Sequence, residues 1–394
     1  MHEPPQLGEH VPPDRSLLGP GPSDVHPRVY RAMTGGMVGY MDDSYLDVMD
    51  DLQAGLRYVF QTDNEYTLGV SGTGSAAMEM AFTNLVEPGE TVLVPSNGYF
   101  GQRMGQVAER AGATVETVDA PWGEPLDVGD VEQAFARHQP TVFGFVHGET
   151  STGVRQPDVA ALADVAHEHD AYVIADTVAS LGGSEFRTDD WNVDVVYSGA
   201  QKCLSAPPGV SPITFSDRAV DKVFAREEPT RSWYLDLAGI WDYWTDEPSY
   251  HHTGPISTTY ALREALRLVG EEGLTERWAR HRRVAGALRE GVAALGAPVA
   301  VPEEYWLPTL NAVSVPDGVD ADGVVDGLME EYGIEIVGGL GALEGEIFRV
   351  GCMGHSARPV NVLEFLRAFG SVLETEGADV DAAAGVAAAA GALD

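Results

Sequence analysis

Short apolar segments and amphipathic segments alternate along the first half of the chain. Residues 43–60 place apolar side chains at helical spacing, which predicts a long helix. Apolar runs bounded by turn residues predict strands at 66–71, 91–95, 114–118, 141–146, 171–175, 193–197 and 211–215. Helical patterns separate most of these runs. Such alternation predicts an α/β fold with a doubly wound, mainly parallel sheet, in which ligands bind at the carboxyl ends of the strands.

A second section follows, beginning with a helical pattern over residues 257–295. At 394 residues the chain is long enough for two domains. We therefore predict an N-terminal arm at 1–15, a large domain at 16–265, a smaller C-terminal α+β domain at 266–376 and a low-complexity tail at 377–394. The tail is rich in alanine, and we expect it to be disordered or a frayed helix.

Acidic residues dominate the charge of the chain. The 61 Asp and Glu residues against 24 Lys and Arg give a formal net charge of −37. This excess argues against nucleic acid or an anionic membrane as a partner. The acidic residues are spread among apolar periodic segments, so a disordered acidic chain is not expected. The pattern is typical of a globular, halophilic protein, because salt screens the repulsion between like charges.

Cysteine usage and hydropathy narrow the class of protein further. The two cysteines, Cys203 and Cys352, allow at most one disulfide and do not indicate a metal site. The apolar runs fall short of the roughly 18 residues that a membrane span needs. Residues 1–15 lack the pattern of a signal peptide. We therefore expect a cytoplasmic protein.

Lysine is almost absent from this chain, which has only Lys202 and Lys222. Lys202 follows the predicted strand at 193–197, where small residues surround it. One interpretation is a surface lysine at the end of a strand. The alternative is a lysine whose amine reacts, since arginine can neither lose its proton nor form an imine.

Two further motifs stand at strand ends. The run from Ser71 to Ser75, SGTGS, lies between a strand and a helix, where free backbone N–H groups favour a phosphate. Residues 72–77 also fit the dinucleotide pattern G-x-G-x-x-A, but the next strand does not end in the acidic residue that a ribose needs. A tight turn without a ligand is the third reading. Asp176 ends the strand that begins at residue 171. It is either a counter-ion for a cationic ligand or a structural residue, in a helix cap or a salt bridge.

The order of these motifs predicts pyridoxal 5′-phosphate. Its aldehyde requires a primary amine, its pyridinium nitrogen a carboxylate, and its phosphate a helix N-terminus. Lys202, Asp176 and the loop at 71–75 supply one group each. The conjunction carries this prediction, since each motif alone is weak.

The chain resembles the class V aminotransferases of fold type I, within the alanine–glyoxylate and serine–pyruvate aminotransferase group. The matching segments are residues 19–33, 58–62, 71–90, 97–104, 147–154, 174–183, 194–217, 250–266 and 348–358. The run 176–217 is the most specific. The resemblance implies a large sheet domain with a smaller C-terminal domain, pyridoxal 5′-phosphate as cofactor, and a homodimer whose active sites are shared between the subunits.

The same resemblance implies roles for individual residues. Lys202 would bind the cofactor covalently and move the α-proton of the substrate, and Asp176 would pair with the pyridine nitrogen. Arg349 would bind the substrate carboxylate, as a bidentate guanidinium does. Tyr250 and Thr253 would reach the phosphate of the neighbouring subunit. The implied cofactor set is Gly72, Thr73, Gly74, Phe100, Thr150, Asp176, Val178, Gln201, Lys202, Tyr250 and Thr253.

The chain departs from the family at two positions. Ser75 stands where the family often has His, and Phe100 stands where alanine–glyoxylate enzymes often have a Trp that stacks on the cofactor ring. Three histidines, His147, His251 and His252, are interpreted as structural rather than catalytic.

The implied reaction moves an amino group from alanine or serine to glyoxylate or pyruvate. An aspartate donor is one alternative, although we identify no second arginine for its side chain. A cysteine desulfurase-like lyase is another, but those enzymes carry His where this chain has Gln201 and Phe100. A dinucleotide-dependent oxidoreductase and a non-catalytic protein that binds the cofactor are the remaining classes.

The net charge of −37 predicts that salt stabilises the folded protein. We expect the thermal melting temperature to rise from low to molar KCl, because the Debye length shortens to about 3 Å at 1 M. A neutral osmolyte at the same osmolality is the control for preferential exclusion. A melting temperature that falls with KCl would contradict this prediction.

Overall fold

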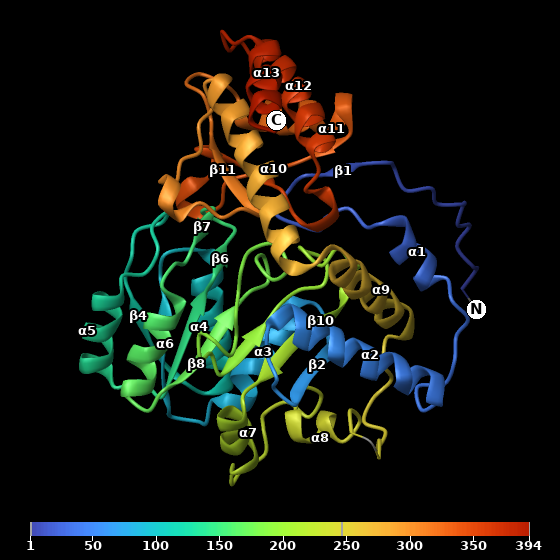
Figure 1. Ribbon diagram of the computed structural model, residues 1–394, viewed down its shortest axis with the longest axis vertical. Helices are drawn as coiled ribbons and strands as arrows, with labels where there is room; N and C mark the ends of the chain where they lie inside the picture. Colours follow the sequence, from blue (N-terminus) through green and yellow to red (C-terminus); the bar gives the residue numbers. More distant parts are fainter. Residues whose placement is uncertain (1, 246, 394) are drawn as a thin grey trace.

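The computed structural model describes residues 2–245 and 247–393. A seven-stranded sheet forms the centre of the larger, N-terminal part (Figure 1). In spatial order its strands are β2 (Tyr66–Gly72), β10 (Gly209–Phe215), β9 (Val195–Tyr197), β8 (Tyr172–Asp176), β5 (Val142–Val146), β3 (Thr91–Pro95) and β4 (Thr114–Val118). The strands are parallel except β10, which runs antiparallel to both of its neighbours.

Helices cover both faces of this sheet, as the alternating pattern predicts. One face packs against α2 (Asp43–Phe60), α5 (Val128–His138), α6 (Val159–Glu168) and α9 (Ile256–Glu272). The other packs against α3 (Gly74–Leu85), α4 (Tyr99–Ala111), α7 (Asp217–Phe224) and α8 (Leu237–Trp241). Within β8, Val173 and Ala175 belong to the first core and Ile174 to the second. A strand buried on both faces requires an apolar residue at every position, which explains the continuous apolar runs.

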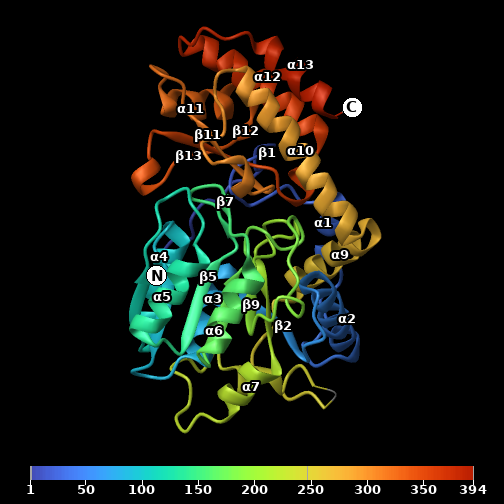
Figure 2. The same ribbon diagram turned by 60° about the vertical axis from the view of Figure 1, so that its left-hand side comes forward.

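The C-terminal part is a smaller α+β layer above the sheet (Figures 1 and 2). Its sheet has the order β11 (Leu310–Ser314), β14 (Ile347–Gly351) and β13 (Val337–Gly338). Its helices are α10 (Leu274–Ala294), α11 (Ala321–Tyr332), α12 (Pro359–Thr375) and α13 (Ala382–Leu393). Their apolar faces form a separate core. The predicted boundary at 265/266 falls inside α9. This helix ends at Glu272, and Gly273, with φ of +81°, separates it from α10.

The C-terminal tail differs from the sequence-based expectation. The alanine-rich tail forms α13, which packs on α10 and α12 and buries Gly385 and Ala389. Of the two expectations for the tail, a disordered segment is wrong for residues 382–393, which form a helix. This helix packs instead of fraying, because its small side chains allow close packing. In the smaller part, β12 (Ile334–Glu335) and β13 are separated by one residue and belong to different sheets. The aromatic-rich connection after residue 233 contains the short helix α8.

The N-terminal segment joins the two parts of the molecule. Residues 2–15 have no helix or strand and are exposed. The strand β1 (Ser16–Leu17) then pairs in parallel with β12 of the smaller part, and α1 (Pro27–Met33) packs against α9 of the larger part. The segment between β1 and α1 therefore crosses the junction between the two parts.

Candidate active site

A cavity of about 180 Å³ lies at the carboxyl end of β8. It is lined by Thr73, Gly74, Ser75, Met78, Phe100, Arg103, Val146, Gly148, Thr150, Asp176, Val178, Ala179, Gln201 and Lys202. Eight of the predicted cofactor residues are among these: Thr73, Gly74, Phe100, Thr150, Asp176, Val178, Gln201 and Lys202. The fold therefore brings the phosphate loop, the strand-end carboxylate and the lysine to one place.

Lys202 lies in the turn that follows β9, with its side chain largely buried. Its Nζ donates a hydrogen bond to the carbonyl of Pro20. Burial lowers the pKa of the Lys202 amine, and the nearby positive charge of Arg349 acts in the same direction. The amine is therefore closer to its neutral, nucleophilic form than a solvent-exposed lysine would be.

The segment before α1 shapes the space around this lysine. A Cβ added to Gly21, where φ is +108°, would lie 2.6 Å from Lys202 Nζ. Ser23 Oγ donates to the carbonyl of Lys202 at 2.7 Å, and Ser23 N donates to the carbonyl of Gln201 at 2.9 Å. The glycine- and proline-rich entry segment thus holds the turn that carries the lysine.

Asp176 is 3% exposed and has two hydrogen-bond donors. The backbone N–H of Val178 donates to its Oδ1 at 2.8 Å, and the Tyr197 hydroxyl donates to its Oδ2 at 2.9 Å. Burial raises the pKa of Asp176 to about 6, although both donors act to lower it. A cation placed against this carboxylate would lower its pKa and compensate for its burial.

The first turn of α3 offers the predicted phosphate site. Its N-cap Thr73 makes no side-chain capping bond, so the first N–H groups of the helix are not capped by that side chain. Thr73, Gly74 and Ser75 all line the cavity. Gly72 stands at the end of β2 with φ of +148°, a conformation that favours glycine, but it does not line the cavity. A Cβ added to Gly72 would lie 2.6 Å from Ala76 Cβ, so a glycine here lets β2 lead closely into the start of α3.

The side-chain amide of Gln201 lacks a hydrogen bond that a buried polar group needs. Its Oε1 is buried and has no hydrogen-bond partner among the described residues. Amide oxygen and nitrogen are assigned only through their hydrogen bonds, so this end of the side chain can also donate to a phosphate. Together with the carboxylate of Asp176, the amine of Lys202 and the start of α3, this residue shows that the cavity fits pyridoxal 5′-phosphate.

Sequence reasoning missed two residues that position the site. Glu149, 2% exposed, accepts from the backbone N–H of Phe100 at 2.9 Å and from Ser151 Oγ at 2.7 Å. It therefore caps α4, which carries Phe100, from the loop that carries Thr150. Tyr197 is the second, since its apolar strand context gave no sign that its hydroxyl meets Asp176. Both contacts join residues 21 or more positions apart.

Two arginines lie near the cavity. Arg349 on β14 is 7% exposed, and its Nε donates to the carbonyl of Gly338 at 2.8 Å. It does not line the cavity, although its charge lowers the pKa of Lys202. Arg103 on α4 does line the cavity, with its guanidinium 5.0 Å from the centre of the Phe100 ring. Arg103 is the second cationic group that the sequence left unidentified.

Tyr250 and Thr253 do not line this cavity. Tyr250 is 51% exposed, its hydroxyl lies 3.2 Å from Thr253 Oγ1, and its ring contacts that of Tyr40. Within one chain these residues are therefore not brought to the predicted phosphate site. Their predicted contribution to a neighbouring subunit stays a prediction.

The three histidines have structural surroundings. His147 is 1% exposed and its Nδ1 lies 2.8 Å from Ser180 Oγ, and burial lowers its pKa to about 3. His252 Nε2 lies 2.7 Å from Ser71 Oγ, and His251 stacks on Trp233. None of the three lines the cavity.

Cys203 is fully buried beside Lys202. Its Sγ donates to the carbonyl of Ala179 at 3.3 Å, and burial raises the pKa of the thiol to about 11. A thiol with so high a pKa is a poor nucleophile, which argues against a direct chemical role. Cys203 is a packed neighbour of the site.

Comparison with known proteins places the geometry in context. A profile of the family described as "Aminotransferase class-V" matches residues 29–353. The chain is 41% identical to an alanine–glyoxylate aminotransferase of Callithrix jacchus, covering 89% of this chain and 85% of that protein. It is 37% identical to a (S)-ureidoglycine–glyoxylate transaminase of Bacillus subtilis (strain 168), covering 96% and 95%. The crystal structure of an alanine–glyoxylate aminotransferase from Nostoc sp. superposes with a TM-score of 0.92 at 45% identity, covering 93% and 97%.

The hydrogen bond from Tyr197 to Asp176 predicts a pH effect on cofactor binding. The hydroxyl stabilises the carboxylate form, so Tyr197→Phe should raise the pKa of Asp176 further. A hydrogen bond to a charged group contributes roughly 1.5–3 kcal/mol, which corresponds to roughly one to two pH units. As the pH falls, binding of pyridoxal 5′-phosphate to the apoprotein should therefore weaken at a higher pH than in the wild type.

Spectroscopic titration of the cofactor across pH measures this shift. Tyr172→Phe is the matched control, because Tyr172 lies on β8 but its ring contacts Arg218 and Lys222 rather than the cavity. Identical pH dependence in the Tyr197 variant and the wild type would show that the hydroxyl does not tune Asp176.

Proposed function

This chain belongs to the class V aminotransferases, and on that basis we propose that it transfers an amino group from alanine or serine to glyoxylate or pyruvate, with pyridoxal 5′-phosphate as cofactor. The observation that carries the proposal is one cavity that Lys202, Asp176 and the start of α3 line together. The acceptor is supported by two relatives, both of which are named for glyoxylate.

The residues of the cavity divide the work of transamination. The bound cofactor supplies a ring that stabilises negative charge at the α-carbon of the substrate. Asp176 holds a proton on the ring nitrogen, which its buried carboxylate favours through charge attraction. The Lys202 amine, with its pKa lowered by burial, would take the α-proton of the substrate and deliver it to the cofactor carbon that is bonded to the amino nitrogen. Arg349 binds the substrate α-carboxylate.

Two observations widen the set of donors. Arg103 lines the cavity and favours a donor with a second carboxylate, such as aspartate. The Bacillus subtilis relative favours (S)-ureidoglycine. The rate of the half-reaction with alanine, serine, aspartate and ureidoglycine ranks these donors directly. It is measured as the loss of the visible cofactor band.

A homodimer with shared sites completes the proposal. Tyr250 and Thr253 form an exposed pair away from the cavity of their own chain. In a twofold dimer each subunit presents the same surface to the other, so this pair would reach the phosphate of the partner's site.

We propose a halophilic, cytoplasmic setting for the enzyme. The charge of −37 supports the first part. Both cysteines are free and buried, as in a reducing compartment. The part of the chain that the structure describes contains no helix whose length and hydropathy would let it cross a membrane.

Replacing Lys202 should abolish transamination. Lys202→Arg keeps the positive charge but removes the primary amine, so we expect a loss of at least about 10²–10⁴ in kcat, the usual contribution of a positioned base. The visible cofactor band of the wild type should also change. The assay couples alanine and glyoxylate to pyruvate formation.

Lys222→Arg is the matched control, since Lys222 is the other lysine of the chain, pairs with Glu90 and does not line the cavity. Equal activity in Lys202→Arg and Lys222→Arg would refute the assignment.

Mixed dimers test the shared site. Coexpressed Lys202→Ala and Tyr250→Ala chains form heterodimers in which one site keeps both wild-type residues. Random assembly should then recover about a quarter of the wild-type activity. Coexpressed Lys202→Ala and Asp176→Ala chains are the control, because both of these residues belong to one chain's own cavity and no intact site forms. If both mixtures are dimeric and neither recovers activity, the site is not shared between subunits.

A further inference from the structure

A second cavity, of about 420 Å³, is lined in part by the residues that follow Lys202 in the same turn. Gln201 and Lys202 line the cofactor cavity, whereas Leu204 and Ser205 line this one. Its other walls come from the start of α1, from α9 and α10, and from the turn that ends at Arg358. A cavity of this volume suits a small organic molecule.

The lining of this cavity has an apolar side and a polar side. The apolar side consists of Val29, Leu204, Ala265 and Leu268. The polar side carries histidines, arginines and glutamates. An occupant that matches both sides has an apolar part and a polar head.

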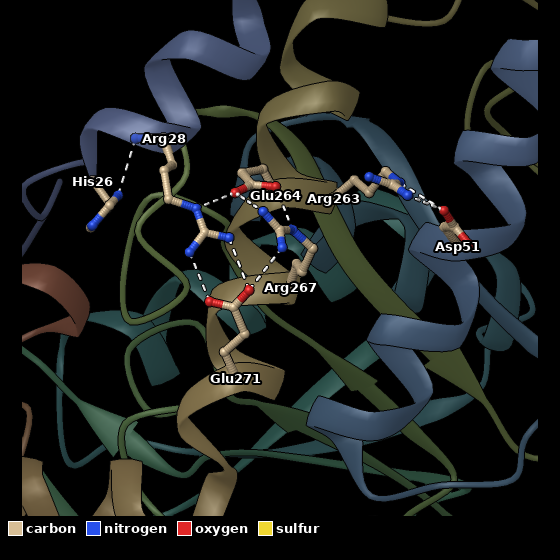
Figure 3. A network of polar contacts seen from close by, with 7 residues as sticks. All are labelled: His26, Arg28, Asp51, Arg263, Glu264, Arg267 and Glu271. Carbon is tan, nitrogen blue, oxygen red and sulfur yellow. Dashed lines mark hydrogen bonds and ion pairs between the residues drawn. The ribbon is translucent and has the colours of Figure 1, made fainter.

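Both glutamates of the polar side already have arginine partners. Glu272 accepts from Arg277 Nη1 at 2.6 Å and from Arg280 Nη2 at 3.0 Å. Glu271 accepts from Arg28 Nη1 at 2.7 Å and from Arg267 Nη1 at 2.8 Å (Figure 3). Neither carboxylate therefore requires a cationic ligand.

Positive charge remains after these pairs are counted. Among the charged residues that line the cavity, Arg277, Arg280 and Arg358 face two glutamates, Glu271 and Glu272, which leaves one positive charge. Asp24, whose Oδ2 accepts from Asn361 Nδ2 at 3.4 Å, does not line the cavity. Within residues 2–245 and 247–393, no carboxylate pairs with Arg358, whose Nη2 donates to Asn361 Oδ1 at 3.0 Å. The free positive charge is thus at the end of the cavity that Arg358 lines.

Two histidines stand beside this arginine. His26 Nδ1 accepts the backbone N–H of Arg28 at 3.0 Å (Figure 3), so its proton lies on Nε2, which is left to donate. The His26 and His355 rings are 4.9 Å apart. Burial, followed by the charge of Arg358, lowers the pKa of His355 to about 4. An anion at this point would offset the charge of Arg358.

We propose that this cavity binds a small organic anion. Its carboxylate or phosphate head contacts His26, His355 and Arg358, and its apolar part lies against Val29, Ala265 and Leu268. The site is separate from the cofactor cavity, and the proposal does not depend on the transamination reaction.

Isothermal titration calorimetry of the holoenzyme at constant salt tests the proposal. Benzoate and phenyl phosphate carry the two heads on the same ring, and binding of either one assigns the head. We expect one such site per chain, and about tenfold weaker binding in Arg358→Gln, because a charge-assisted contact is lost. Arg358 is exposed, so this substitution spares the core.

Arg283→Gln is the matched control, since Arg283 is an exposed arginine on α10 that does not line the cavity. It should bind the probes as the wild type does. Phenyl phosphate should also bind several-fold more tightly than inorganic phosphate, because its ring buries apolar surface. The proposal is overturned if neither probe binds, if Arg358→Gln binds like Arg283→Gln, or if phenyl phosphate binds no more tightly than inorganic phosphate.

Discussion

Two ionisable groups, the Lys202 amine and the Asp176 carboxylate, are buried at one edge of the sheet, and the groups around them must replace the water that they have lost. An uncompensated buried charge costs several kcal/mol, so such a pair persists only where donors and acceptors are held in place. The Val178 N–H and the Tyr197 hydroxyl donate hydrogen bonds to Asp176, and the carbonyl of Pro20 accepts one from Lys202. The same burial moves both pKa values toward neutrality, which is what proton transfer requires.

The segment before α1 connects this pair with the smaller part of the molecule. Ser23 bonds to the Lys202 turn, and the carbonyl of Leu18 accepts from Gly351 N at 2.6 Å, at the end of the strand that carries Arg349. The distance between the lysine and the arginine proposed for the substrate carboxylate therefore depends on a few residues rich in glycine and proline. Their rigid, turn-forming backbone suits that task.

Basic residues are few in this chain, and several of them are concentrated around the two cavities. Arg277 donates to the carbonyls of Gly182 and Cys203, which brings α10 against the Lys202 turn. Ser205, with φ of +56°, accepts from His355 N on the opposite wall. The cofactor cavity and the second cavity consequently share one turn, and the contacts that shape the second also support the first.

The sequence by itself determined the alternation of strands and helices, because a strand buried on both faces must be apolar throughout. It also determined the main chemistry, since a glycine-rich helix start, Asp176 and Lys202 each stand where a strand ends. Only the tertiary structure decided the reversal of β10 and the packing of α13. It also decided the contact of Glu149 with Phe100, that of Tyr197 with Asp176, and the place of Arg103. These features depend on side chains that meet across different elements, and the periodicity along a chain carries no information about such distances.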